Sequence, residues 1–252
     1  MLLGWPLFYW IGGSFGLTAV GDLLLSTRID SQEARYYFLH ALVNLVVVIL
    51  ILPDVMRFLA DPLAGLEGEY TDGPLAATVG LHMFHCVSQA KKLTAVDWAH
   101  HLVSNMLVSF LCFPFRYGPL MNWACFYVCG LPGGIDYALL FLVKQGVMTK
   151  AKEKSINRIL NMWIRLPGIV AFVPFSYVIH MAGRSSVPAY LLVMQSLLNS
   201  FNAIYFADRV VANHAVFVER AKGEKVEKSS RENLSKLETT PTKAATWAVE
   251  PM

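Results

Sequence analysis

The chain has 252 residues, of which 55% are hydrophobic and only 15% are charged, and its mean hydropathy is +0.46. A soluble domain of this size needs more charge to cover its surface, so the composition excludes an ordinary soluble protein and predicts an integral membrane protein. The formal net charge is only +3, and we expect no nucleic acid among the partners.

Seven stretches of the sequence have the length and apolar character of a membrane-spanning helix, which needs about 20 mostly apolar residues. They lie near residues 2–25, 36–56, 74–90, 97–114, 119–143, 159–182 and 187–207. The third and fourth are short, and several others contain prolines, which are tolerated where neighbouring helices satisfy the freed backbone groups. The predicted fold class is an all-α polytopic membrane protein, a bundle of about seven transmembrane helices.

The first stretch has two interpretations, a cleaved signal peptide or a retained span. No basic residue precedes its apolar run, which continues for about the length of a full span. These features favour a retained span. We therefore assign residues 1–29 to the first transmembrane span and a short loop.

Basic residues predict the orientation of the chain. Lysine and arginine concentrate in the odd-numbered connections between the predicted spans and after the last span, whereas the even-numbered connections hold only Arg57, Arg116 and Arg184. The positive-inside rule then predicts a cytoplasmic C-terminus and a lumenal N-terminus. Residues 216–252 are rich in Lys, Glu, Ser and Thr, a composition that predicts a disordered, charged cytoplasmic tail.

Nearly every predicted span contains polar side chains at helical spacing. They are His40 with Asn44, His82 with His85 and Gln89, Asp97 with His100, His101 and Ser104, Asn161 with Arg165, and Gln195 with Asn199 and Asn202. Together they predict a polar seam inside the bundle. The Asn and Gln residues fit hydrogen bonds that hold helices in register. Ionisable groups cost more to bury, so Asp97, His100, His101, Asp136 and Arg165 fit either packing or a functional site.

We expect neither a metal ion nor a cofactor. His82, His85, His100 and His101 would bring four nitrogen donors from two neighbouring helices. Successive residues of an α-helix point about 100° apart, however, so only one of the two adjacent histidines should share a site with the facing pair. All four cysteines fall in apolar stretches and are interpreted as inert buried thiols.

The segment DWAHHLVS, residues 97–104, contains an Asp-aromatic pair, a double His, an apolar residue and a Ser. In this order it resembles the core of the TLC domain, shared by ceramide synthases, translocating-chain-associating membrane proteins and small lipid-homeostasis proteins. His85 matches an upstream histidine of the family. LPGGIDYALLFLVK, residues 131–144, is similar to the second conserved stretch of ceramide synthases, with Asp136 and Lys144 in place, and MQSLLNSFNAIYF, residues 194–206, resembles the closing helix. The resemblance identifies residues 30–215 as a TLC-like helical domain.

One departure from the family bears on chemistry. Ceramide synthases carry a His-Asp pair in the second stretch that acyl transfer needs, where this sequence has Pro132 and Gly133. Neither residue can take up a proton or an acyl group. The resemblance therefore implies a protein of the endoplasmic reticulum or another endomembrane that acts in membrane lipid homeostasis without ceramide synthase chemistry. The Pro-Gly-Gly string also predicts a sharp break or a close backbone approach in the fifth span.

The resemblance implies a site that holds a lipid or acyl chain, with membrane lipids or acyl-CoA as ligands and a membrane protein as a further partner. The expected lipid-binding residues are His85, Asp97, His100, His101, Asp136 and Arg165. The alternative is a membrane acyltransferase in which His100 and His101 act as catalytic base, Asp136 orients them, and His85 or His180 replaces the missing histidine. A third hypothesis is a channel or transporter, because a polar seam can also be a pathway.

Overall fold

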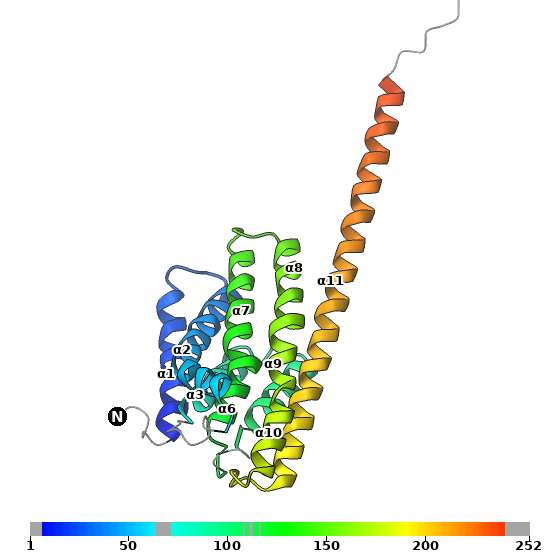
Figure 1. The fold of residues 1–252 in the computed structure, drawn as a ribbon. Coiled ribbons are helices and arrows are strands. Elements are labelled where there is room, and N and C mark those ends of the chain that lie inside the picture. Colours follow the sequence, from blue (N-terminus) through cyan, green and yellow to red (C-terminus); the bar gives the residue numbers. More distant parts are fainter. Residues whose placement is uncertain (1–6, 64–71, 108, 111–112, 116, 240–252) are drawn as a thin grey trace, which may run out of the picture.

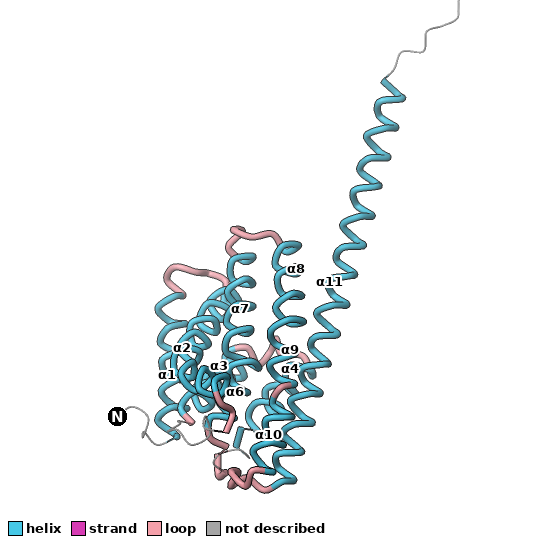
Figure 2. Tube along the Cα trace, in the orientation of Figure 1, coloured by secondary structure: helices cyan, strands magenta, loops and turns pink. Residues whose placement is uncertain are grey.

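A computed structural model describes residues 7–63, 72–107, 109–110, 113–115 and 117–239. Every regular element within these residues is a helix, and Figure 2 shows no strand in the described chain. The helices stand side by side in one bundle, along which α11 (Ala189–Thr239) runs before it continues far beyond the other helices (Figure 1). The all-helical architecture predicted from the sequence is confirmed.

Twelve further helical segments precede α11 in the described chain. They are α1 (Leu7–Leu25), α2 (Gln32–Ala60), α3 (Gly73–Ser88), α4 (Ala95–Ala99), the π-helix η3 (His100–Leu107), α6 (Pro119–Cys125), the π-helix η4 (Phe126–Gly130), α7 (Leu131–Lys144), α8 (Lys150–Leu160), the π-helix η5 (Asn161–Arg165), α9 (Leu166–Val170) and α10 (Phe172–Met181). Side-chain caps define several starts: Ser31 Oγ accepts from the Ala34 amide before α2, and Thr149 Oγ1 accepts from the Lys152 amide before α8.

Within the described residues, four helices are long and apolar enough to span a membrane. They are Leu7–Leu25, Gln32–Ala60, Pro119–Lys144 and Lys150–Met181, which correspond to the first, second, fifth and sixth predicted spans. The other three predicted segments also contain helix, in α3, in α4 with η3, and in the first half of α11. They are shorter or more polar, so the count of seven spans stays a prediction.

The bundle has an apolar outer face and a partly polar interior. Large apolar side chains are exposed, among them Leu17 at 76% and Leu23 at 70%, whereas polar ones are buried, among them Asn44 at 0% and Asn161 at 1%. A soluble protein shows the opposite distribution. Apolar side chains that face outward and polar side chains that face inward are expected for helices in a bilayer.

The apolar core lies where α2, α6 and α10 meet. The rings of Phe58 and Phe175 have centroids 5.2 Å apart, and Trp123 contacts both at 5.9 and 5.0 Å. The indole nitrogen of Trp123 donates to the Gly168 carbonyl at 2.8 Å, so its polar atom is satisfied within the core.

The first helix packs tightly on α3. Ser14 Oγ donates to the Ala77 carbonyl at 2.7 Å, and a Cβ placed on Gly80 would lie 2.3 Å from the Ile11 carbonyl oxygen. The two backbones therefore approach to a distance that only glycine permits at this position. This contact makes α1 an integral part of the bundle.

The Pro-Gly-Gly string produces the predicted close approach, without a break. The segment from Pro119 to Lys144 is continuously helical through η4 and α7. A Cβ on Gly133 would lie 3.0 Å from Asn44 Nδ2, and one on Gly134 would lie 3.3 Å from Asn44 Cβ. The glycines therefore let α7 pack closely against α2.

The C-terminal segment differs from the predicted disordered tail at 216–252. The structure is helical as far as Thr239, and residues 240–252 lie outside the described chain. This part of α11 has ion pairs between residues one helical turn apart. Lys222 Nζ lies 2.9 Å from Glu219, and Arg231 lies 2.5 Å from Glu227. Good helix-forming residues can extend an existing helix without the cost of a new nucleus, which composition alone does not reveal.

Candidate functional site

A cavity of about 430 Å³ lies inside the bundle, and the six residues predicted as lipid-binding all line it. They are His85, Asp97, His100, His101, Asp136 and Arg165. The remaining wall includes polar residues and an apolar part from α11, namely His40, His82, Asn105, Cys129, Tyr137, Asn199, Asn202, Leu198, Phe201, Ala203 and Phe206. Five histidines, two carboxylates and one guanidinium thus border a single space.

All three π-helices found in the described chain contribute to this cavity. The wall contains His100, His101, Val103 and Asn105 of η3, Val128 and Cys129 of η4, and Arg165 of η5. A π-helix bonds i to i+5 and has a wider turn than an α-helix, so successive side chains diverge by less than about 100°. Such segments are frequent at functional sites.

The ring positions overturn the expectation that only one of the adjacent histidines shares a site with the facing pair. The ring centroid of His82 on α3 lies 5.1 Å from that of His101 and 6.1 Å from that of His100. His85, one turn further along α3, lies 4.7 Å from His101. Both members of the double His, at the start of η3, therefore contact His82, and His101 also contacts His85.

Two stacked His-Tyr pairs close the site on the side of α2 and α7. The ring of His40 stacks on Tyr137 at 3.7 Å, and the ring of His85 stacks on Tyr36 at 3.8 Å. The Tyr36 hydroxyl also lies 2.8 Å from His40 Nδ1. Sequence patterns placed His40 and His82 in the polar seam but did not predict them as lipid-binding residues. They did not identify Tyr36 or Tyr137. The adjacency of Tyr137 to Asp136 was the available signal.

Asp97 has a structural task at the start of α4. Its Oδ2 accepts from the Thr94 amide at 2.9 Å and from the Thr94 hydroxyl at 2.7 Å, and Thr94 Oγ1 accepts from the Asp97 amide at 3.2 Å. This reciprocal capping box fixes where the helix begins, and so it positions the double His one turn later. The Asp in the DWAHHLVS segment thus orients the histidines through the backbone.

Asp136 and Arg165 supply the charged groups of the opposite wall. Arg165 Nη1 donates to Asn161 Oδ1 at 2.9 Å, the pair predicted from the i, i+4 spacing. Asp136 Oδ1 and Arg165 Nε are buried, and among the described residues neither has a hydrogen-bond partner. Buried polar atoms normally have partners, so these two are candidates to bind a polar ligand.

The remaining residues considered for the site lie elsewhere. His180 is exposed on α10 and does not line the cavity. Lys144 Nζ pairs with Glu33 at 2.6 Å near the ends of α7 and α2, where both side chains are more than 40% exposed.

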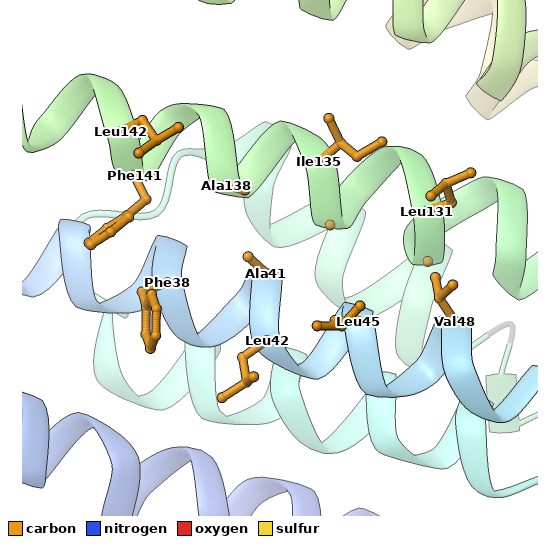
Figure 3. A pocket seen from close by; sticks show the side chains of 12 residues that line it. Phe38, Ala41, Leu42, Leu45, Val48, Leu131, Ile135, Ala138, Phe141 and Leu142 are labelled. Carbon is orange, nitrogen blue, oxygen red and sulfur yellow. The ribbon is translucent and has the colours of Figure 1, made fainter. Parts of the chain in front are cut away.

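An apolar groove runs between α2 and α7 (Figure 3). Its volume is also about 430 Å³, and its lining includes Phe38, Leu42, Leu45, Leu131, Ile135, Phe141 and Leu142. The rings of Phe38 and Phe141 lie 5.3 Å apart at one end. Gly134 borders the groove and Gly133 borders the polar cavity, so the same turn of α7 contributes to both.

Comparisons with models of protein families, with curated proteins and with solved structures find no match to this chain.

Proposed function

We propose that this chain is a multi-pass membrane protein of the TLC-domain type that binds a lipid and acts in membrane lipid homeostasis. The observation that supports this most directly is that the six residues expected from the resemblance come from five helical segments and border one cavity. The bundle around them has an apolar outer face. An apolar outer face is what a protein needs to take its ligand from the bilayer.

The cavity size sets the part of a lipid that it accommodates. About 430 Å³ falls in the range of small-molecule sites, roughly 300–1,000 Å³. This volume holds a headgroup with its adjoining amide or ester rather than a whole lipid. Asp136 and Arg165 offer unpartnered polar atoms to that region. Phe201 and Phe206 of α11 supply an apolar wall for the start of an acyl chain.

The proposed topology has seven spans, with the N-terminus lumenal and the C-terminus cytoplasmic in the endoplasmic reticulum or another endomembrane. The four long apolar helices would be completed by α3, by α4 with η3, and by the first half of α11. These three helices contain many of the polar side chains of the seam, which lowers their mean hydropathy. Glycosylation acceptor sites inserted at 26–31 and at 183–187 test the orientation, because only the second insertion should be modified.

The lipid proposal is tested by identifying what co-purifies with the full chain. Mass spectrometry of protein extracted in mild detergent should find one lipid class in excess over the bulk membrane composition. Asp136→Asn should reduce that excess, whereas Asp208→Asn, an exposed carboxylate change on α11, should not. A lipid profile equal to that of the bulk membrane in the unaltered protein would overturn the proposal.

The second candidate is a lipid acyltransferase, favoured by the placement of His85, His100, His101 and Asp136 around one space. A general base needs hydrogen-bond reach to the reacting group, and this cavity could bring a substrate hydroxyl or amine to the double His. Purified protein is supplied with acyl-CoA and a long-chain base or lysolipid. Turnover that disappears in both His100→Ala and His101→Ala would establish the enzyme and reject the non-catalytic function.

A further inference from the structure

Three histidines of the cavity lie close enough to share one small ligand. One ring nitrogen from each of His82, His100 and His101 lies within 4.8 Å of the other two. His82 and His101 are buried and His100 is half-buried. The three come from α3 and from η3, two elements whose approach is set by the packing of the bundle rather than by sequence proximity.

The surroundings of His82 fix which of its ring nitrogens carries a proton. His82 Nδ1 lies 2.7 Å from the Thr78 carbonyl oxygen, which can only accept, so Nδ1 carries the proton and donates. In the neutral form of this ring the second nitrogen, Nε2, has a free electron pair. Metal-binding histidines are commonly held in this way, with the outer nitrogen bonded to a backbone carbonyl.

The other two histidines have nitrogens without hydrogen bonds. His100 Nδ1 and His101 Nδ1 are buried and have no hydrogen-bond partner among the described residues. Buried polar atoms normally have hydrogen-bond partners, so two buried imidazoles with unpartnered nitrogens are not explained by packing alone. A shared cation would satisfy a nitrogen of each ring at once.

We propose that His82, His100 and His101 bind a divalent transition-metal ion of the zinc type. Imidazole nitrogen suits zinc, copper, iron and nickel, whereas magnesium and calcium prefer oxygen ligands. Zinc-nitrogen bonds of about 2.05 Å in a tetrahedron place the nitrogens about 3.3 Å apart, so the rings would move inward by at most about 1.5 Å. The three histidines leave the fourth position open toward the cavity, the arrangement of reactive rather than structural zinc sites.

This site goes beyond lipid binding and does not require it. The open position would face the same space as Asp136 and Arg165. Arg165 adds a positive charge to the wall, so a water molecule or an anionic oxygen is the fitting fourth ligand. Cys129 also lines the cavity, but its Sγ donates to the Cys125 carbonyl, which favours a site made of nitrogen alone.

The test is metal analysis of the full chain purified without a histidine tag. After exposure to zinc chloride and gel filtration, we expect one zinc per chain, and titration with cobalt chloride should give the intense visible absorption of a tetrahedral site. His82→Ala, His100→Ala and His101→Ala should each weaken binding by about 100-fold or more, since loss of an outer partner alone costs about 10- to 100-fold. His180→Ala removes an exposed histidine and should leave binding unchanged.

Several outcomes would overturn the proposal. Zinc retained in the three variants, or lost equally in His180→Ala, would place the metal elsewhere. A thiolate charge-transfer band in the cobalt spectrum would show that a cysteine binds the ion. If a variant fails to fold, the cobalt titration of the unaltered chain still tests the proposal. Absence of saturable binding at micromolar cobalt would show that the site does not exist.

Discussion

Asn122 on α6 donates a hydrogen bond of 2.5 Å from Nδ2 to Oδ2 of Asp54 on α2, across 68 residues of sequence. Both side chains are buried, at 1% and 5% exposure, and Asp54 also pairs with Arg57 along the same helix. A carboxyl group inside a bundle depends on such partners. Without a hydrogen bond, nothing offsets the free energy that it loses when it leaves water. This contact joins two helices that sequence patterns alone do not pair.

Asn122→Ala should lower the free energy of unfolding by about 1–3 kcal/mol, because it leaves Asp54 Oδ2 buried without this donor. Thermal melting of the protein in detergent measures the effect. Asn213→Ala, an exposed change of the same type on α11, is the control and should melt with the unaltered chain. Equal melting temperatures for the two variants would contradict the role given to the contact.

Gly80→Ala should destabilise the packing of α1 on α3, because the added methyl would lie 2.3 Å from the Ile11 carbonyl oxygen. Overpacking of this kind costs about 1–3 kcal/mol. Gly12→Ala is the matched control, since no atom lies within 4 Å of its added Cβ and alanine favours a helix by about 1 kcal/mol over glycine. The melting temperature should fall for Gly80→Ala only, and a fall of the same size in both would point to a general effect of alanine.

Gly133→Leu, which adds a bulky side chain at the close approach, should destabilise the contact between α2 and α7. Its Cβ would lie 3.0 Å from Asn44 Nδ2, and we expect a loss of about 1–3 kcal/mol. Adding Asn44→Ala removes the facing amide and should recover part of the melting temperature. No recovery in the double variant would mean that the strain lies elsewhere.

Lys144→Ala should change the free energy of unfolding by less than about 1 kcal/mol. Its ion pair with Glu33 joins side chains that are 41% and 47% exposed, and exposed pairs contribute little. Denaturant titration measures the change. A loss as large as that of Asn122→Ala would show that this pair does more than its exposure implies.

A chain that ends at Val218 should melt at the temperature of the full chain. The helix beyond that residue extends past the bundle (Figure 1), while His214, which lies 3.4 Å from Ser155 Oγ, is retained. Amide hydrogen exchange should be faster in residues 219–239 than in the first half of α11, because helix without tertiary packing opens easily. Slow exchange there in the full chain would reveal a partner or a contact of this segment.

Much of the helical layout could be predicted from hydropathy. The predicted spans at 36–56 and 119–143 lie inside the long helices Gln32–Ala60 and Pro119–Lys144. Hydropathy depends on the local sequence and therefore locates apolar helices well. A helix with inward-facing polar side chains has a lower mean hydropathy, so the number of spans is harder to predict. The extent of α11 was missed for a related reason, because charged residues that look disordered in composition still extend a helix that has already formed.

The sequence by itself determined that polar residues recur on particular helix faces, since periodicity follows from helix geometry. It could not determine that a π-helix begins at His100, nor that α3 and η3 lie side by side, because contacts between separate helices are not encoded in local periodicity. The contact between α3 and η3 brings both adjacent histidines to His82 and forms the proposed metal site. Sequence patterns named the double His, and only tertiary packing decided what the two rings face.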